Sequence, residues 1–514
     1  MKNQFTFFRT ATVFFAALMT IAATNLQAQG WNTGPGGNSL RNGQSEFHGP
    51  TEPTLLWSGS LNSVIAQQAV CDGDYLAMTR MHSISDVLQG TKIVMHNLQT
   101  GDTLWTASLP VDFPATDWRS RVSAINDGRV YCTRSGNANE SYLYALDVET
   151  GTILWKSEDV MTEGTTEGLT FEPNGDPIVG SMYYLTRFSK ETGEVVWRTQ
   201  RQSYDGGSSA IVSGGYVYTT INLFNMVGLA AFDLETGELL RTSEPLVGGF
   251  VNQLGIFADN NGMVYLPHCQ NVAETDSLFA LVDDGNSIQR LWAVAIPYTP
   301  FATFGVGPDE TIYAYNRVSL MRFDAQTGAA INLSKEIFFV DAYSPRMAID
   351  ANGIIYVTNG GTANGMLYSF NADLTLRWEL SAPYGSATGP ILGKDGTLVL
   401  AGKGTDVRAF VGSEPTGVVF SEITEGILVA SPNPATEVIT FTFLSPDPGI
   451  NELQIFDMNG KLIRQLTLAN GIVGKHQIDW DLSDSYGNRV HEGVYICRYA
   501  SASSAGVVKC IVSK

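Results

Sequence analysis

The six histidines are the side chains best suited to bind a metal ion or to act as a general base, but their spacing fits neither role. No two of them have the spacing of a zinc-binding helix, and His268 beside Cys269 is not a ligand set by itself. We therefore expect no metal ion and interpret these histidines as structural. They are His48, His82, His96, His268, His476 and His491.

Acidic and glycine-rich turns are the next candidates, because they can hold calcium or phosphate. Asp72-Gly73-Asp74 and Asp283-Asp284 lack the ligand spacing of an EF-hand loop. The Gly-Gly pairs are not followed by a helix that would complete a phosphate-binding loop. Hairpin turns explain these residues more economically, so the sequence predicts no cofactor and identifies no catalytic residue.

Aromatic and polar side chains in the longer connections are better suited to binding, because aromatic surfaces with a few polar groups recognise peptides or glycans. The alternative is that these side chains only cap the packing between structural repeats. We predict a binding surface formed by Trp118, Arg119, Arg121, Glu167, Tyr204, Phe250, Asn252, Tyr343 and Arg346.

The elements that position these residues belong to a repeat. Residues 143–156, LYALDVETGTILWK, consist of two alternating runs joined by a Glu-Thr-Gly turn, which predicts a β-hairpin. Related hairpins end at Trp105, Trp197 and Arg241. Each follows an Asp/Asn-Gly or similar turn, and these turns recur roughly every 40 to 55 residues, the period of four-stranded propeller blades.

The two ends of the repeat region are complementary. The run Leu55-Leu56-Trp57 matches the last strand of a repeat without its partners, and the final repeat lacks its closing tryptophan strand. Joining them would close a ring and remove exposed sheet edges. We predict an all-β fold with an eight-bladed propeller, seven blades being the alternative. The recurring tryptophans are interpreted as packing between blades, with sugar platforms as the alternative.

The predicted turns define two faces. The Asp/Asn-Gly turn joins the first and second strands of a blade, and the Thr-Gly turn joins the third and fourth. Both short turns therefore lie on one face, and the longer, more varied connections lie on the other. Variable loops on a rigid scaffold are where binding usually resides, so the long-loop face is the predicted functional surface.

The ALDVETGTILW unit, with the lead-in GGNSLRNG, resembles the repeat of quinoprotein-like β-propellers over roughly residues 31–412. That family includes quinone-dependent alcohol dehydrogenases and non-enzymatic scaffolds. For an enzyme of this family, the resemblance implies a pair of adjacent cysteines near the cofactor. This sequence has no Cys-Cys pair. We expect the fold without the redox chemistry.

A linker, residues 413–426, precedes several short strands that predict a small Ig-like β-sandwich over 427–514. This region resembles the type A sorting domain of type IX secretion. The resemblance implies passage through the periplasm, handling by the type IX machinery and usually removal of the domain. The matching residues are Pro432, Asn433, Pro434, Gly460, Gly487, Gly493, Tyr495 and Lys514.

Two of the five cysteines, Cys497 and Cys510, depart from the sorting-domain pattern. A hairpin turning near Ser503-Ser504 would place them opposite each other, close enough to bridge. A disulfide and two buried free thiols are both compatible with the sequence.

The N-terminus carries Lys2 and Arg9, an apolar run and the small-residue site Leu26-Gln27-Ala28, which predict a signal peptide (1–28) cut between Ala28 and Gln29. Residues 29–50 form a lead-in segment and 51–412 the propeller. The formal net charge of −20 argues against nucleic acid, and no other run is long enough to span a bilayer. We expect a secreted or cell-surface protein that binds a protein or glycan; the alternative is an extracellular glycan hydrolase or lyase.

Overall fold

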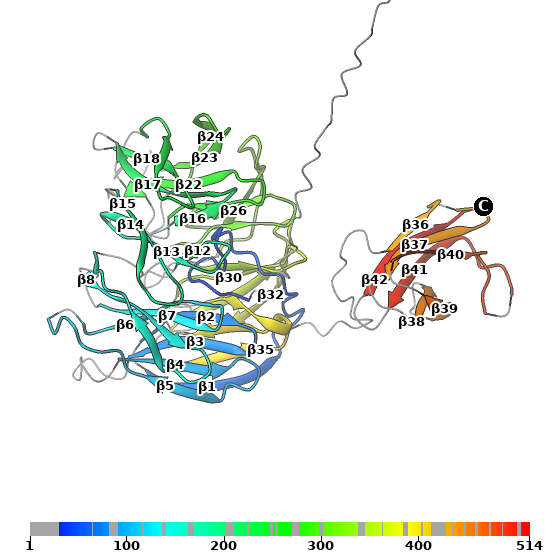
Figure 1. Cartoon of the computed structure of the whole chain (residues 1–514), viewed down its shortest axis with the longest axis horizontal. Coiled ribbons are helices and arrows are strands. Elements are labelled where there is room, and N and C mark those ends of the chain that lie inside the picture. Colours follow the sequence, from blue (N-terminus) through cyan, green and yellow to red (C-terminus); the bar gives the residue numbers. More distant parts are fainter. Residues whose placement is uncertain are drawn as a thin grey trace, which may run out of the picture. The chain divides into compact units, whose positions relative to one another are not determined.

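The computed structural model describes residues 30–513 except for 64, 82–90, 116, 136–139, 163–168, 202–209, 224–225, 247–249, 252–254, 270–276, 298–301, 338–344, 362, 384–388, 402–403, 413–427, 434, 446–448, 458–460, 472–473, 486 and 501–504. The chain divides into two compact units, Met1–Ser413 and Glu414–Lys514 (Figure 1). The described part is almost entirely β, and its one helix is the short 3₁₀ turn η1 (Lys394–Gly396). No helix there is long and apolar enough to cross a membrane.

In its described residues the first unit contains eight large sheets, seven with four strands and one with five, and one two-stranded sheet. Four of these sheets come from the first half of the unit. They are β2 (Ile65–Asp72), β3 (Tyr75–Met81), β4 (Thr91–Asn97) and β5 (Thr103–Ala107); β6 (Ser120–Asn126), β7 (Arg129–Arg134), β9 (Leu143–Asp147) and β10 (Ile153–Lys156); β12 (Thr170–Phe171), β13 (Pro177–Gly180), β14 (Tyr184–Phe188) and β15 (Val195–Gln200); and β16 (Ala210–Ser213), β17 (Tyr216–Leu223), β18 (Met226–Asp233) and β19 (Leu239–Thr242).

The other four sheets follow the same order. They are β20 (Phe250–Val251) and β21 (Phe257–Ala258), both paired with β22 (Val264–Cys269), then β23 (Ser277–Asp283) and β24 (Ile288–Ala295); β25 (Gly305–Val306), β26 (Ile312–Tyr315), β27 (Leu320–Phe323) and β28 (Ala330–Leu333); β29 (Met347–Ile349), β30 (Ile355–Thr358), β31 (Met366–Phe370) and β32 (Leu376–Ser381); and β33 (Ile391–Leu392), β34 (Leu398–Ala401), β35 (Gly404–Phe410) and β1 (Leu55–Ser63). A two-stranded sheet joins β8 (Glu140–Ser141) to β11 (Met161–Thr162).

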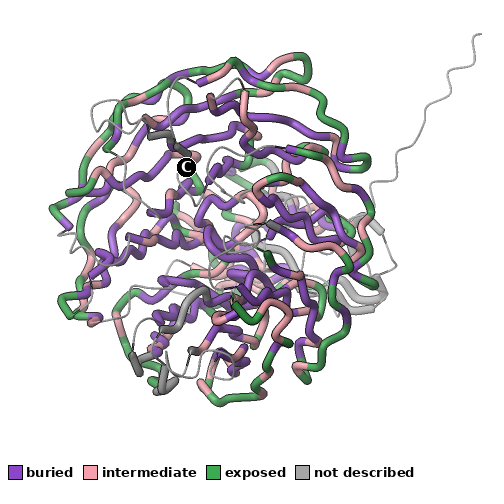
Figure 2. The backbone as a smooth tube through the Cα atoms, turned by 90° about the vertical axis from the view of Figure 1, so that its left-hand side faces the viewer, coloured by how far each residue is buried: buried purple, intermediate pink, exposed green. Residues whose placement is uncertain are grey.

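Strand pairing confirms the predicted two faces. In the second sheet, Asn126 pairs with Arg129 across the Asp-Gly turn, and Leu146 pairs with Ile153 across the Thr-Gly turn. Both short turns therefore lie at the same end of the sheet. The connections β7–β9 and β5–β6 lie at the other end, on the long-loop face. Buried residues (purple in Figure 2) line the interior strands, and exposed residues (green) lie at the edges and turns.

The predicted closure between the two ends of the repeat region is confirmed. Strand β1 pairs antiparallel with β35, with Leu55 opposite Phe410 and Ser58 opposite Arg408. The strand nearest the N-terminus thus completes the sheet formed by the last three strands of the unit.

The lead-in segment, for which the sequence showed no periodicity, fills the central axis. Between Trp31 and Ser45 it makes at least one hydrogen bond to each of the eight sheets. The bonded pairs are Trp31–Cys71, Asn32–Ile125, Ser39–Thr170, Arg41–Ala210, Leu40–Ala258, Asn42–Val306, Gly43–Ile349 and Ser45–Leu392, at 2.7–3.3 Å. Only an axial segment can reach all eight sheets. We call residues 30–49 the plug.

The recurring tryptophans pack between neighbouring sheets, as predicted. In five of the sheets the indole N–H donates to a backbone carbonyl beside the Thr-Gly or equivalent turn of the next sheet, at 2.7–3.1 Å, whereas the Nε1 of Trp378 is buried without a hydrogen-bond partner among the described residues. The pairs are Trp57–Leu98, Trp105–Val148, Trp155–Lys190, Trp197–Leu234 and Trp292–Ala325. Arg241 replaces the tryptophan in the fourth sheet and forms an ion pair with Asp283 at 2.6 Å.

The second unit contains two sheets. The first sheet has the strand order β36 (Leu428–Ser431), β37 (Ile439–Ser445), β40 (Gly474–Trp480). The second has the strand order β39 (Leu462–Gly471), β38 (Gly449–Asp457), β41 (Gly493–Ala500), β42 (Ala505–Val512). One hydrophobic core unites them, with Phe441 and Trp480 from the first sheet and Ile455 and Tyr499 from the second.

The sorting-motif residues that the structure describes brace this unit. Asn433 donates from Nδ2 to the Lys509 carbonyl at 2.6 Å and accepts from the Ile511 N–H at 2.8 Å. The Tyr495 hydroxyl donates to the His491 carbonyl at 2.8 Å. Gly487 has φ 84° and Gly493 has φ 156°. Pro434, Gly460 and Lys514 lie outside the described residues.

Of the two alternatives left open for Cys497 and Cys510, the structure has the free thiols and not the disulfide, and the register explains why. Cys497 pairs with Val508 and Cys510 with Tyr495, so the hairpin is shifted by two residues from the predicted register. Both cysteines are free and fully buried. A two-residue shift keeps both side chains on the core face, where they contribute as small apolar groups.

Candidate functional site

The best-described part of the long-loop face is the connection 108–119 between β5 and β6. Its conformation is fixed by Asp117, which is 1% exposed and whose Oδ2 accepts the N–H groups of Asp112 and Phe113, both at 2.7 Å. Arg134 on β7 donates to the carbonyls of Asp117, at 2.8 Å, and Leu109. Burial lowers the pKa of Arg134, and the nearby Asp117 opposes this effect. The connection is therefore held rigidly against the second sheet.

An aromatic group lies beside this connection. The rings of Phe113 and Tyr142 stack at 5.7 Å with an interplanar angle of 11°. The Lys156 ammonium lies 3.8 Å from the centre of the Tyr142 ring and forms an ion pair with Asp112. Tyr144 also donates to Asp112, and burial, followed by this hydrogen bond, raises the pKa of Tyr144. The group presents a flat aromatic surface with a cation and a carboxylate at its edge.

Three of the predicted binding residues lie at the inner end of the same connection. The guanidinium of Arg119 is 5.3 Å from the centre of the Trp118 ring, within the range of a cation–π contact. Arg121 follows at the start of β6. Alternation places Arg119 and Arg121 on one face of the strand, opposite Ser120 and Val122, and Val122 packs against the first sheet.

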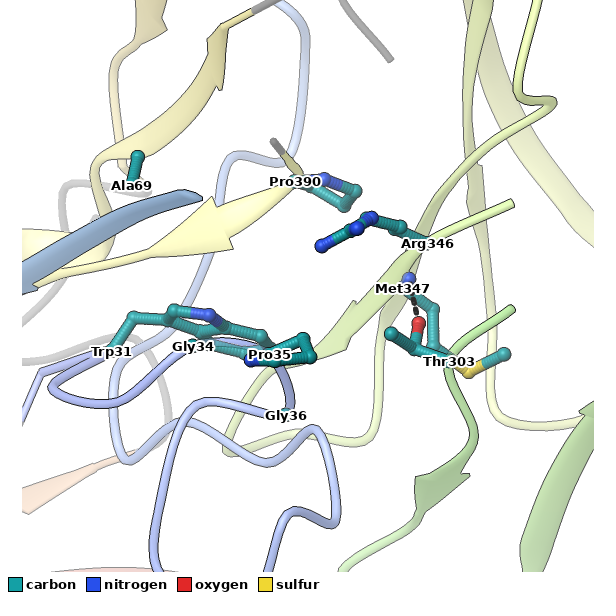
Figure 3. Close-up of a pocket in the computed structure, with 9 residues that line it drawn as sticks. All are labelled: Trp31, Gly34, Pro35, Gly36, Ala69, Thr303, Arg346, Met347 and Pro390. Atoms are coloured by element: carbon teal, nitrogen blue, oxygen red, sulfur yellow. Dashed lines mark hydrogen bonds between the residues drawn. The ribbon is translucent and has the colours of Figure 1, made fainter. Parts of the chain in front are cut away.

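Arg346 lies at the start of another inner strand, immediately before β29. Its side chain points into a small cavity on the axis, lined also by Trp31, Pro35, Thr303 and Pro390 (Figure 3). The free space is on the order of one water molecule. The floor of the cavity is the tip of the plug, Gly34–Gly36, and its walls come from the long-loop ends of inner strands. The channel is thus closed from the short-turn side and faces the long loops.

The structure brings Trp118, Arg119 and Arg121 together and places Arg346 at the corresponding end of another inner strand. It describes the backbone of Phe250 in β20 but not its side chain, and Glu167, Tyr204, Asn252 and Tyr343 lie outside the described residues. The same holds for the predicted cleavage site, Ala28 and Gln29. The sequence reasoning missed Asp112, Tyr142, Lys156 and the plug residue Trp31. Tyr142 and Lys156 carried a signal, because they flank the repeat hairpin at its long-loop end.

A quinone with its calcium ion, as used by the dehydrogenases that the repeat resembles, does not fit the residues described here. The axial cavity presents one charged group, Arg346, and its free space is far too small for a tricyclic cofactor. In the described part of the chain, no three His, Cys, Asp or Glu side chains converge as a metal site. We derive no reaction step through a quinone.

Two family models match the chain. Residues 89–332 match a repeat model described as outer membrane protein assembly factor BamB. Residues 430–513 match the secretion system C-terminal sorting domain. No curated protein matches the chain. The first match confirms the predicted PQQ-like repeat, and the second confirms the predicted sorting domain.

Three solved structures align with this chain. A europium-containing methanol dehydrogenase aligns with a TM-score of 0.54 and 13% identity, covering 74% of this chain and 91% of its own. BamB from Moraxella catarrhalis aligns at 0.49 and 12%, covering 71% and 98%. PorZ, a surface component of the type IX secretion system of Porphyromonas gingivalis, aligns at 0.41 and 12%, covering 87% and 69%. At these identities the first likeness shows the fold alone.

Proposed function

Because this chain joins a PQQ-like repeat propeller to a C-terminal sorting domain that directs export to the cell surface or medium, we propose that it is an extracellular binding protein. Its long-loop face recognises a glycan or protein outside the cell. The type IX secretion machinery exports it and removes the sorting domain. The predicted boundaries belong to this proposal: a leader over 1–28, a propeller over 51–412, a linker over 413–426 and the sorting domain over 427–514.

One observation carries the proposal: the plug closes the axis at the short-turn face. In six of the eight sheets it bonds to the last or second-last residue of the inner strand. In these six sheets the plug therefore supplies a hydrogen-bond partner at the short-turn end of the inner strand. The long-loop face retains the variable connections and the axial cavity with Arg346, and this is the arrangement of a one-sided binding surface.

The finer architecture is also proposed. We interpret the eight sheets as eight blades of one ring, since each inner strand bonds to the plug and β1 joins the last sheet to the first. We interpret the second unit as an Ig-like sandwich. The hydroxyl of Tyr495 donates to a carbonyl four residues upstream, a feature that resembles the tyrosine corner of such folds.

Binding is favoured over glycan cleavage by the charges at the channel mouth. A hydrolase needs a carboxylate pair converging on the bond that it cleaves. Among the described residues that line the axial cavity, Arg346 is the one with a charged side chain, and it is cationic. Arginine binds and orients anionic groups but does not exchange protons near neutral pH.

The proposal is tested by returning fluorescently labelled full-length protein to cells of the producing strain that lack its gene. We expect saturable surface binding, reduced several-fold by Trp118→Ala and unchanged by Arg129→Gln, which alters the short-turn face. Equal binding by all three proteins would contradict recognition through the long-loop face. Release of soluble sugar from the cells, in proportion to protein and time, would favour the enzymatic alternative.

A further inference from the structure

A strip of polar side chains lies on one side of the second sheet, where β6 and β7 reach the long-loop face. The strand register defines it. Arg121 pairs with Thr133, and the Ser135 N–H donates to the Arg119 carbonyl at 2.8 Å. Because side chains alternate along a strand, all four residues occupy the same side of the β6–β7 ladder. We call Arg119, Arg121, Thr133 and Ser135 the arginine strip.

The arginine strip is on the side of the ladder that faces the third sheet. Alternation places Tyr131 on the same side of β7 as Ser135, and the Tyr131 ring packs against Phe171 of β12, with ring centres 5.5 Å apart. Ser120 and Val122 lie on the opposite side, and Val122 packs against the first sheet. The apolar joint between the second and third sheets therefore ends in polar residues at the long-loop face.

Two donor groups of the arginine strip have no partner among the described residues. Arg121 takes part in no ion pair there, and its Nε is buried without a hydrogen bond. Ser135 is 3% exposed, and its hydroxyl is also buried without a hydrogen bond. The two residues are diagonal neighbours across the ladder, within reach of a long side chain. Buried donors without an acceptor are costly, and an anion that accepts from both would remove the cost.

The donor set fits a tetrahedral oxyanion. The planar guanidinium of Arg121 can donate two parallel hydrogen bonds to two oxygens of one anion. The Ser135 hydroxyl adds a third donor from the neighbouring strand, and Arg119 adds positive charge. A sulfate or phosphate ester has three terminal oxygens for these three donors, whereas a carboxylate has two.

An aromatic surface adjoins the arginine strip. The ring of Trp118 lies 5.3 Å from the Arg119 guanidinium. Aromatic rings cover the apolar faces of sugars, and a serine phosphate in a peptide has no such face beside its anionic group. The combination of an aromatic surface with an oxyanion site therefore favours a sugar ester over a phosphopeptide.

From these observations we propose that the arginine strip binds the sulfate or phosphate ester group of an extracellular glycan, with Arg121 and Ser135 as the oxyanion-binding residues. Sulfated and phosphorylated sugars share this tetrahedral group. The inference rests on the proposed binding function and assigns one of its contacts to the joint between the second and third sheets.

The experiment is isothermal titration calorimetry of the full-length protein with galactose, its sulfate ester, its phosphate ester, galacturonate and phosphoserine. Wild type is compared with Arg121→Gln and Ser135→Ala. Ser120→Ala is the matched control, because the Ser120 hydroxyl is also buried without a hydrogen bond but lies on the opposite side of the ladder. Arg290→Gln controls for charge, because Arg290 is exposed on the outer strand β24.

We expect a galactose ester to bind and galactose itself not to bind. The Kd should rise at least about tenfold in Arg121→Gln and about threefold or more in Ser135→Ala, the losses typical of charged and neutral hydrogen bonds. Ser120→Ala and Arg290→Gln should bind like wild type. The melting temperature of unliganded Arg121→Gln should stay close to that of wild type, because Arg121 has no partner among the described residues to lose. The ester that binds more tightly identifies the source of the oxyanion.

Four results would overturn the inference. Equal affinity for galacturonate would exclude selection of a tetrahedral group, and equal affinity for phosphoserine would assign the site to phosphopeptides. Equal weakening by Ser120→Ala and Ser135→Ala would remove the assignment to the arginine strip. Binding of none of the probes, with cell-surface binding by the wild type retained, would overturn this inference and leave the proposed function intact, whereas loss of cell-surface binding itself would contradict the proposed function.

Discussion

The indole of Trp57 lies directly against Gly101 of the neighbouring sheet. A Cβ added to Gly101 would come within 2.6 Å of the indole ring, and the Trp57 Nε1 donates to the carbonyl of Leu98 at 2.9 Å. Trp57 belongs to β1, which closes the ring, so this contact joins the last sheet to the first. The same contact recurs between Trp105 and Gly151, which explains why the repeat pairs a tryptophan with a Thr-Gly turn.

The indole hydrogen bond at this contact can be measured by substitution. Trp57→Phe keeps an aromatic ring but removes the donor, so we expect a loss of about 1–2 kcal/mol in the free energy of unfolding. Trp378→Phe is the matched control, because the Trp378 Nε1 is buried without a hydrogen-bond partner among the described residues. Trp378→Phe should therefore lower the free energy of unfolding by less than Trp57→Phe does. Denaturant unfolding measures both, and equal losses would contradict a role for the hydrogen bond.

The plug should be sensitive to substitution where its backbone is tightest. Gly37 has φ 84°, and a Cβ there would lie 2.6 Å from the Trp31 ring. Gly128 has φ 72° and no atom within 4 Å of an added Cβ. Alanine costs about 1–2 kcal/mol at either site for the positive φ. At Gly37 the overlap should add about 1–3 kcal/mol. If thermal unfolding shows equal losses for Gly37→Ala and Gly128→Ala, the plug is not packed as described.

Cys497 and Cys510 should be free but protected thiols. Burial raises the pKa of Cys510 to about 12 and holds that of Cys497 well above its usual range. At pH 8 the thiolate fraction is therefore small, and the sulfurs are inaccessible. We expect negligible iodoacetamide labelling of both in the native protein and full labelling after denaturation without reductant. Detection by mass spectrometry of two peptides linked through these cysteines would show that the disulfide forms and would contradict the prediction.

Acid should weaken the Thr-Gly hairpins. Hydrogen bonds from the following threonine lower the pKa of three aspartates. At Asp147 and Asp324 the threonine hydroxyl is the larger cause, and at Asp233 the backbone N–H is. A carboxyl whose folded-state pKa is depressed stabilises the fold above its unfolded pKa, about 3.9, and loses this effect as the pH falls through the folded value.

The matching experiment compares wild type with a triple Asp→Asn variant at positions 147, 233 and 324. Wild type should have the higher melting temperature at pH 6, and the difference should shrink between pH 4 and pH 2. Asp350, whose pKa is raised by burial, acts in the opposite direction but equally in both proteins. A difference that is constant with pH would contradict the role of these carboxylates.

The sequence predicted the repeated elements well because hairpin chemistry is local. Turn glycines and alternating runs located the strands of each sheet, and the unmatched strand at Trp57 predicted the closure with β35. The plug was not predicted, since its place depends on single backbone hydrogen bonds to eight distant strands rather than on any pattern of its own. The predicted register of the β41–β42 hairpin was also wrong. A shift of two residues keeps the same side chains on the buried face, so the alternating sequence pattern does not distinguish the two registers.

The candidate site was predicted in part. Trp118, Arg119 and Arg121 are adjacent in the sequence, so their proximity needed no tertiary information. The bond from Arg134 to the carbonyl of Asp117 joins a strand to the preceding long connection, and this rigid support could not be read from composition. In the fourth sheet Arg241 takes the place of the tryptophan that packs between neighbouring sheets. The sequence did not explain this replacement, because the ion-pair partner Asp283 belongs to the next sheet.

The mass and location of the mature protein in its native cells are the most direct test of export and extracellular binding. We expect a product outside the cell that begins near Gln29, retains the plug and ends within 413–426, because the sorting domain directs export and is then removed. Intact-mass analysis of the culture medium and of the washed cell surface distinguishes released from attached product. A full-length chain confined to the periplasm would contradict export and, with it, recognition of an extracellular ligand.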